Sequence, residues 1–468
     1  MGFVNEFADW AVGSYAGGLP ARLREGSGWR LLDVVGNSLA AVATEPAAIA
    51  QALGEEWGGQ PQATVLGMPA KYPTATAAFI NGTLAHALDF DDTHLPSIVH
   101  PSASVVPAAL AAGEASHASG AQVLDAVTIG TELAVRLGMA GYDPRRGVSI
   151  FFERGFHATS ICGAIGGAVA AALLRGDDTT QVAAAAGIAA SMGAGILEAN
   201  RTGGSVKRVH CGWAAHVAIC AAAMAHHGLT GPPTVFEGRF GLVSSHCGDE
   251  AQPEVVLSEL GTRWEVDNIA FKPYPCNVFT HAIIDAVIAL REDGLRPDAV
   301  ASIEIGGPQA ALRTIAFPVE EKARPRSGYH AAFSAPYVAA SAILGGGGLG
   351  LSHADFADER LLEAARMDLA AKVTCVVDDE CDRLFPAQMP AVVRVVTTDG
   401  TTVERRVDAS RGTPTNPLTA TELMSKFRGN LASVGRERDA ERIIEQTLGL
   451  QQAESIDAFL AVVGPRDG

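Results

Sequence analysis

The segment from Asn81 to Ser104 holds most of the side chains in this sequence that could do chemistry. It reads NGTLAHALDFDDTHLPSIVHPSAS and places three aspartates and three histidines among mostly apolar neighbours. These residues are Asp89, Asp91, Asp92, His86, His94 and His100. Removing such groups from water is costly unless they are paired. Either the acids lie in a solvated loop that follows a helix, or the loop from Thr93 to Pro101 folds inward and presents Asp and His to a substrate.

A cluster of Asp and His also raises the question of a metal ion. His86 and Asp89 are three residues apart and could share one helix face. No second pair at such a spacing matches them, because His226 and His227 are adjacent and do not share a face. The spacing therefore favours a site without a metal.

Two other segments combine a histidine or a lysine with the start of a helix. In GFHATS, residues 155–160, Thr159 or Ser160 would cap a helix rich in Gly and Ala, so that its N-terminal amides face an anion beside His157. The alternative is a structural cap with a half-buried histidine. In GGSVKRVH, residues 203–210, Lys207 and Arg208 lie in a first helical turn, where cations oppose the helix dipole and suggest a bound anion. The alternative is an exposed pair on a frayed turn.

A third segment, FKPYPCN at residues 271–277, lies where the sequence pattern changes. Prolines on both sides fix the loop that carries Lys272, and junctions between domains often form ligand clefts. The alternative is a linker that contains one lysine. A further segment, SGYH at residues 327–330, is a weaker candidate and is more typical of a helix start.

Composition limits the classes of function. The net charge of −17 argues against nucleic acid or an anionic membrane as partner, and an anionic substrate would need local cations. The seven cysteines form no C-x-x-C pair, and the N-terminus lacks the basic region of a signal peptide. The most apolar run, residues 159–174, is shorter than the roughly 20 residues that span a bilayer. These features predict a soluble cytoplasmic protein, and a charged fraction of 19% suggests a homo-oligomer with covered surface.

Hydrophobic periodicity predicts the elements that position these segments. We expect helices over residues 4–16, 27–53, 74–88, 105–116, 120–138, 159–174, 179–192 and 207–227. Strand-like alternation appears at residues 298–307 and 391–409, the latter centred on an Asp399-Gly400 hairpin turn. Helical segments over 334–344 and 358–371 lie between these strands. The predicted fold is mainly α: an all-helical domain over 1–268, a smaller α+β domain over 269–409, and C-terminal helices over 410–468 that return to the helical domain.

Together these segments resemble the MmgE/PrpD family, which includes 2-methylcitrate dehydratase, cis-aconitate decarboxylase and iminodisuccinate epimerase. The resemblance rests on NGTLAHALDFDDTH with HPSAS, GFHATSICGAIGGA, GSVKRVHCGWAAH, TVFEGRFGL and FKPYPCNVFTHAIIDA. It implies a large helical domain with a smaller α+β lid domain. It also implies a homodimer without metal or cofactor, and an active site between the domains that takes a small di- or tricarboxylate.

The resemblance also assigns roles to particular residues. The implied catalytic residues are Asp89, His100, His157, Lys207 and Lys272, and the implied substrate-binding residues are Thr93, Ser160, Arg208, Asn277 and Tyr329. In this scheme the lysines hold carboxylates and stabilise an enolate-like intermediate. The two histidines titrate near neutrality and suit general acid–base catalysis. Asp89 would orient a histidine or take a proton itself.

Two positions depart from the family pattern. Asn277 stands where cis-aconitate decarboxylases have a histidine, and Phe333 stands where dehydratases and decarboxylases have one. Both changes remove an ionisable group near the implied pocket. We therefore expect a lyase, first a dehydratase of a 2-methylcitrate-like acid. The alternatives are an epimerase or isomerase of an iminodisuccinate-like dicarboxylate, a decarboxylase of a cis-aconitate-like acid, and a carboxylate-binding homologue without turnover.

Overall fold

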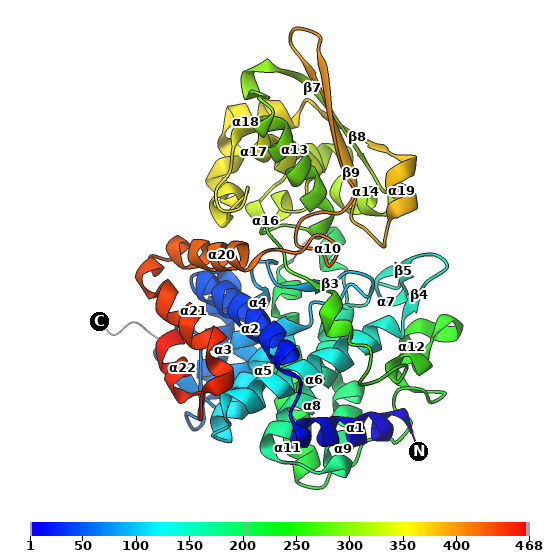
Figure 1. Cartoon of the computed structure of the whole chain (residues 1–468), viewed down its shortest axis with the longest axis vertical. Coiled ribbons are helices and arrows are strands. Elements are labelled where there is room, and N and C mark those ends of the chain that lie inside the picture. Colours follow the sequence, from blue (N-terminus) through cyan, green and yellow to red (C-terminus); the bar gives the residue numbers. More distant parts are fainter. Residues whose placement is uncertain (1, 203, 465–468) are drawn as a thin grey trace. The chain divides into compact units, whose positions relative to one another are not determined.

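A computed structural model describes residues 2–202 and 204–464. The chain forms a large helical unit, residues 1–269 with 430–468, and a smaller α+β unit, residues 270–429. Residues 410–429, assigned from the sequence to the C-terminal helices, lie in the smaller unit. The predicted fold class, mainly α with a smaller α+β domain, is confirmed (Figure 1).

The large unit contains most of the helices. Its longer helices are α1 (Phe3–Gly17), α2 (Ala21–Ala41), α3 (Glu45–Trp57), α4 (Thr74–His86), α5 (Ser102–Ala115), α6 (Gly120–Met139), α8 (Ala158–Arg175), α9 (Thr179–Met192), α11 (His210–His226), α21 (Ala440–Leu448) and α22 (Asp457–Val463). Its short elements are β1 (Ala63–Thr64), β2 (Lys71–Tyr72), β3 (Thr93–His94), β4 (Tyr142–Asp143), β5 (Val148–Ser149), α7 (Ile150–Glu153), α10 (Ala199–Thr202), the 3₁₀ turn η1 (Val206–Val209) and α12 (Leu242–Cys247). The chain passes between the units within or beside β6 (Ile269–Ala270) and α20 (Ala420–Ser433).

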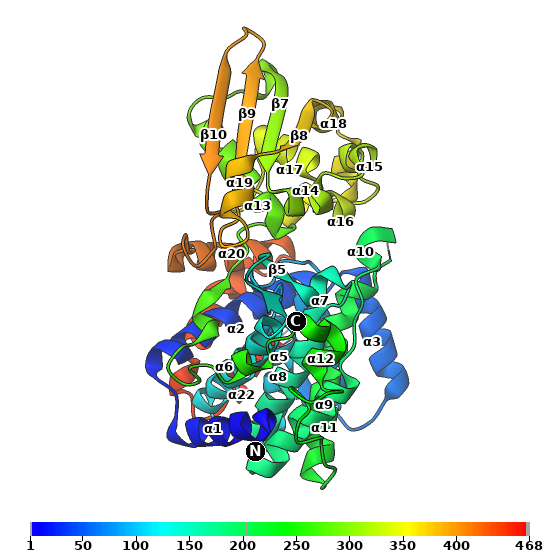
Figure 2. The same ribbon diagram turned by 90° about the vertical axis from the view of Figure 1, so that its right-hand side faces the viewer.

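Helix α8 forms the centre of the large unit. Its sequence, ATSICGAIGGAVAAALLR, is apolar on every side, as expected of a helix that is surrounded by others. Helices α5, α6, α9 and α11 pack against it (Figures 1 and 2). By length and composition alone α8 could span a membrane, but 94% of its apolar window is buried inside the protein. It is therefore a core helix.

The single helix predicted over residues 27–53 is wrong. Two helices occupy this range, because α2 ends at Ala41 and α3 begins at Glu45. Pro46 lies in the first turn of α3. Proline has no backbone N–H to donate to the preceding turn, so it is tolerated at a helix start but interrupts a continuous helix.

Helices α4 and α11 cross at very short range, and glycines make this possible. A Cβ atom on Gly82 of α4 would lie 2.7 Å from the carbonyl oxygen of Cys211. A Cβ atom on Gly212 of α11 would lie 2.3 Å from the carbonyl oxygen of Phe79 and 2.2 Å from Oγ1 of Thr83. The crossing lies one turn from the end of α4 and at the start of α11. It therefore brings the segment after His86 close to the segment before His210.

The smaller unit is built on a four-stranded sheet of order β10-β9-β7-β8 (Figure 2). The strands are β7 (Val300–Gly307), β8 (Val373–Val377), β9 (Ala391–Thr397) and β10 (Thr402–Val407). The predicted hairpin is confirmed: β9 and β10 pair antiparallel, and Gly400 adopts φ 89° in the turn. Strand β8, parallel to β7, was missed because it is short and carries the exposed valines Val376 and Val377, which break the alternation of apolar and polar residues.

Helices cover one face of this sheet. They include α13 (His281–Glu292) and α17 (Ala335–Leu344), with the shorter α14 (Gln309–Ile315), α15 (Val319–Ala323), α16 (Gly328–Ala331), α18 (Ala364–Ala370) and α19 (Asp379–Leu384) in the same unit. Ile303, Ile305 and Val393 point into the core under the helices, whereas Arg394 pairs with Glu304 on the opposite face. The helix predicted over 358–371 is a 3₁₀ segment to Leu362 followed by α18.

Candidate active site

The loop that follows α4 folds into the large unit. Asp91 and Asp92 are both 0% exposed, which excludes the solvated-loop interpretation of this segment. Asp89 adopts φ 51°, a left-handed conformation that Asp tolerates better than most residues, and the chain turns there. Asp92 anchors the loop to the start of α5: its Oδ2 accepts a 2.5 Å hydrogen bond from the Ser102 hydroxyl. Burial raises the pKa of Asp92 to about 7.

The carboxylate of Asp91 lies between two histidines. Its Oδ2 is 2.9 Å from Nδ1 of His86 and 3.7 Å from Nδ1 of His100. His100 Nδ1 also lies 2.9 Å from the Thr93 hydroxyl. The backbone N–H of His100 donates to Oγ1 of Thr159 at 3.0 Å, which fixes the loop against α8. The structure thus brings Asp91, Thr93 and His100 together.

Lys207 contacts the other carboxylate of this loop. Its Nζ lies 3.2 Å from Oδ1 of Asp89, and both side chains are buried. Lys207 belongs to η1, so the predicted helix over 207–227 begins as a 3₁₀ turn and becomes α-helical only at His210. Arg208 follows Lys207 and is partly exposed. The close crossing of α4 and α11 explains why these distant segments meet.

A second pair of histidines lies at the start of α8 and α11. Nδ1 of His157 is 2.9 Å from Nδ1 of His210. The predicted cap by Thr159 or Ser160 is wrong, because His157 itself occupies the N-cap position and α8 begins at Ala158. Ser160 instead donates a 3.1 Å hydrogen bond to the His210 carbonyl, and so ties the start of α8 to the start of α11.

These histidine rings form one group, in which His86, His100 and His157 are buried and His210 is partly exposed. The ring centroid of His86 lies 5.2 Å from that of His100 and 5.7 Å from that of His157, which lies 5.1 Å from that of His210. Burial alone would lower the pKa of His86, but the Asp91 carboxylate outweighs it and raises the pKa to about 10. Burial and the nearby positive charges lower the pKa of His157 well below its usual value and that of His210 to about 4. His86 is therefore charged near neutral pH, and the other two are neutral.

The bond between His157 and His210 restricts their tautomers. A neutral imidazole carries its proton on one nitrogen only. A hydrogen bond between the two Nδ1 atoms requires one ring to carry the proton on Nδ1, which leaves a lone pair on its Nε2. The partner ring then carries its proton on Nε2. The pair thus contains one nitrogen that can accept a proton and one N–H that can donate.

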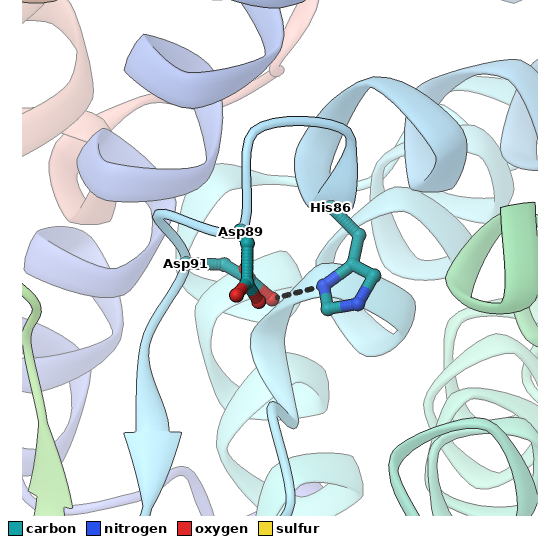
Figure 3. Close-up of side chains that lie close together, drawn as sticks. All are labelled: His86, Asp89 and Asp91. Carbon is teal, nitrogen blue, oxygen red and sulfur yellow. Dashed lines mark hydrogen bonds and ion pairs between the residues drawn. The ribbon is translucent and has the colours of Figure 1, made fainter. Parts of the chain in front are cut away.

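The same residues include a candidate ligand set for a metal. One ligand atom each of His86, Asp89 and Asp91 lie within 4.8 Å of one another (Figure 3). However, the Lys207 ammonium contacts Asp89, and the His86 ring donates to Asp91. A metal ion would have to displace the Lys207 ammonium from Asp89 and the proton of His86 that is donated to Asp91. The donor set therefore fits a network of paired charges better than a metal site.

Three predicted site residues belong to the smaller unit. Lys272 is buried there. Asn277 caps a 3₁₀ turn, because its side-chain oxygen accepts from the backbone N–H of Phe279 at 3.0 Å. The ring of Tyr329 packs on Phe333 with centroids 5.3 Å apart. The roles of Lys272, Asn277 and Tyr329 in catalysis or binding stay predictions.

Three residues of the large-unit site were not assigned from the sequence. They are His86, Asp91 and His210, which pair with one another or with predicted residues. Their spacing to the predicted residues gave no usable signal: α4 ends at His86, and Asp89 lies beyond it in a left-handed conformation. Their partners come instead from other segments of the chain, His86 with Asp91 and His210 with His157.

The chain matches two consecutive domains of one protein family. The MmgE/PrpD N-terminal domain matches residues 5–254, and the MmgE/PrpD C-terminal domain matches residues 274–452. The chain therefore belongs to the MmgE/PrpD family, as the sequence motifs indicated.

Several enzymes resemble the chain over most of its length. It is 29% identical to the cis-aconitate decarboxylase of Homo sapiens, over 99% of this chain and 95% of the relative. It is 28% identical to the cis-aconitate decarboxylase-like protein oryM of Aspergillus oryzae, over 86% and 84% of the two chains. It is 27% identical to the cis-aconitate decarboxylase of Aspergillus terreus, over 85% and 83%. Members of its family are thus enzymes.

Proposed function

We propose that this protein is a cofactor-independent lyase that acts on a small di- or tricarboxylate by proton transfer at a carbon α to a carboxylate. The observation that carries the proposal is the histidine group in which the neutral His157–His210 pair lies beside the His86–His100 pair. Lys207 adds a buried ammonium to the same site. Neutral imidazoles and fixed cations are the groups that such a proton transfer needs.

Each group has a role in this mechanism. An imidazole of the His157–His210 pair exchanges a proton with the substrate carbon through Nε2. Lys207 is shared between Asp89 and the substrate, and it stabilises the enolate-like charge that develops when the carbon bears an extra electron pair. His100, fixed by Thr93 and Thr159, serves as the second acid or base. The resemblance adds Lys272 as a further cation for a carboxylate.

Decarboxylation is the first candidate for the net reaction, because the relatives described above are named as cis-aconitate decarboxylases or decarboxylase-like. The bond between carbon and CO₂ breaks, and its electron pair stays on the carbon, which then takes a proton from an imidazolium. His157 is neutral in the free protein, but a bound polyanion raises the pKa of a nearby imidazole and so supplies the acid.

A second candidate is elimination of water from a 2-methylcitrate-like acid, or epimerisation of a dicarboxylate. Here the imidazole removes a proton from the carbon, and the neutral state of His157 in the free protein suits this step. His100, as the second acid, then gives a proton to the departing hydroxyl in the elimination, or to the other face of the carbon in the epimerisation. Asn277 also supports elimination or epimerisation, because it stands where the decarboxylase pattern has a histidine. Both candidates use the same proton-transfer site.

The proposal is tested by NMR in deuterated water with four acids: cis-aconitate, 2-methylcitrate, citrate and iminodisuccinate. Loss of CO₂ from cis-aconitate, with one deuterium at the product carbon, supports decarboxylation. Loss of water supports the dehydratase, and deuterium exchange at the α carbon without net elimination supports the epimerase. If none of the four reacts although they raise the melting temperature, the protein is a carboxylate-binding homologue and the proposed function is wrong.

A further inference from the structure

His86 lies at the centre of the histidine group, yet none of the roles described above uses it. It is the last residue of α4 and is 1% exposed. Its Nδ1 donates to Asp91 at 2.9 Å, and its ring centroid is 5.2 Å from that of His100 and 5.7 Å from that of His157. The ring is thus adjacent to both candidate acid–base residues.

The second nitrogen of this ring has no partner. Among the described residues, none forms a hydrogen bond with Nε2 of His86, although this atom is fully buried. Figure 3 shows the reason: Nδ1 faces Asp91, and Nε2 lies on the ring edge that points away from both Asp89 and Asp91. Buried polar atoms without partners are rare in native proteins and are costly to maintain. An unpaired Nε2 beside His100 and His157 therefore points to a ligand.

The charges around His86 define what this ligand is. Asp91 holds the ring as an imidazolium, so Nε2 carries a proton and can only donate. The other groups that act on the ring are Lys207, Cys211 and the two neighbouring histidines. A cation would be repelled by the imidazolium and by the Lys207 ammonium. An oxyanion would be attracted by both.

We propose that His86 is a further substrate-binding residue, whose Nε2–H donates a hydrogen bond to a carboxylate oxygen of the bound polycarboxylate. The inference rests on the proposed function, because it takes the ligand of that site to be the substrate. It assigns Asp91 a positioning role: the carboxylate keeps the imidazole protonated and fixes the direction of its free N–H. His86 and Lys207 then bind the anion from different elements, α4 and η1.

Two substitutions at position 86 separate binding from structural support. In His86→Asn the amide replaces Nδ1 and can still donate to Asp91, but nothing occupies the position of Nε2. In His86→Gln the amide nitrogen takes the position of Nε2, and the contact of Nδ1 with Asp91 is lost. A matched control is His226→Asn, because His226 also pairs through Nδ1 with a carboxylate, that of Asp177, but at the opposite end of α11.

The probe is propane-1,2,3-tricarboxylate, which has no hydroxyl group or double bond and cannot react. Calorimetric titration measures its affinity, and thermal unfolding checks each variant. We expect His86→Asn to weaken probe binding about tenfold or more, the effect of losing one charge-assisted hydrogen bond. His86→Gln should retain more affinity than His86→Asn, and His226→Asn should bind like the wild type.

Several results would overturn the inference. Wild-type affinity in His86→Asn, or weaker binding by His86→Gln than by His86→Asn, would show that His86 serves only to hold Asp91. If His86→Asn does not fold, His86→Gln alone decides. A folded His86→Gln that no longer binds the probe would then contradict the role of Nε2 in binding. A wild-type protein that does not bind the probe also contradicts it. The proposed function fails in a different way. In that case none of the four acids is turned over, while binding of the probe still depends on His86.

Discussion

Three histidines in one group differ in charge because their neighbours differ. Asp91 holds His86 as an imidazolium, whereas burial and adjacent cations keep His157 and His210 neutral. The rings are close enough for the charge of one to act on the next. The protein thereby keeps a proton donor and a proton acceptor side by side without either neutralising the other.

The raised pKa of His86 makes the stability of the protein depend on pH. The unfolded chain releases this proton near pH 6.5, and the folded protein releases it near pH 10. The stabilisation is therefore complete below about pH 6.5 and is lost as the pH rises towards about 10. We expect the difference in melting temperature between wild type and His86→Gln to shrink over this interval. Thermal unfolding at several pH values measures it, and a constant difference contradicts the assignment.

Lys207 supplies a fixed charge to the site, so its loss should affect turnover far more than folding. We expect Lys207→Ala to lower kcat/KM by roughly 10² or more, as the loss of transition-state charge stabilisation does. The control is Lys71→Ala, which removes an exposed lysine that pairs with Glu114. This control should keep its activity. Steady-state kinetics of both variants tests the expectation. Near wild-type activity in Lys207→Ala would contradict the assignment of Lys207 to the active site.

The metal question has its own test at this scale. Lys207 and the His86 imidazolium already neutralise Asp89 and Asp91, so we expect EDTA to leave turnover unchanged. Addition of Zn²⁺ or Mn²⁺ after dialysis should not increase it. Activity that falls with the chelator and returns with a divalent ion would instead assign His86, Asp89 and Asp91 as metal ligands.

At the scale of elements, the crossing of α4 and α11 positions the site. A Cβ atom at Gly212 would lie 2.3 Å from the carbonyl oxygen of Phe79. A backbone atom cannot relieve such a clash by changing rotamer, as a side chain can. We expect Gly212→Ala to lower the free energy of unfolding by about 1–3 kcal/mol, the usual effect of overpacking. Gly13→Ala is the control, because a Cβ atom there has no neighbour within 4 Å. It should be neutral or stabilising by up to about 1 kcal/mol. Urea unfolding compares the two.

Elements were predictable from the sequence where one local pattern decides them. Apolar periodicity located α4, α6 and α9 closely, and Asp399-Gly400 specified the hairpin. Strand β8 was missed because Val376 and Val377 are apolar although exposed, so its apolar residues do not alternate along the sequence. In the candidate site, Asp89, His100 and Lys207 could be proposed from residue type and motif. Asp91, which pairs with His86 and His100, and His210, which pairs with His157, could not. Such pairing depends on how the helices cross, which no local pattern records.

At the scale of the whole molecule, the two units differ in how the chain builds them. The smaller unit is one continuous segment, residues 270–429, with its own hydrophobic core. We expect this segment, expressed alone, to unfold cooperatively when heated, since a continuous domain with its own core can fold by itself. Residues 1–269 alone should aggregate, because they lack Phe459 and Val463, which are buried in the intact unit. Circular dichroism and gel filtration test both fragments, and a disordered 270–429 segment contradicts the expectation.

The large unit closes only when its C-terminal helices return. The backbone N–H of Gly67 donates to the carbonyl of Val463, and that of Gly120 donates to the carbonyl of Ala453. On the ribosome, residues 270–468 follow the first segment and take on the order of 10–40 s to synthesise at about 5–20 residues per second. The first part of the protein to be made is therefore the last to be completed. During that interval the nascent chain must keep an unfinished helical surface from associating with other chains.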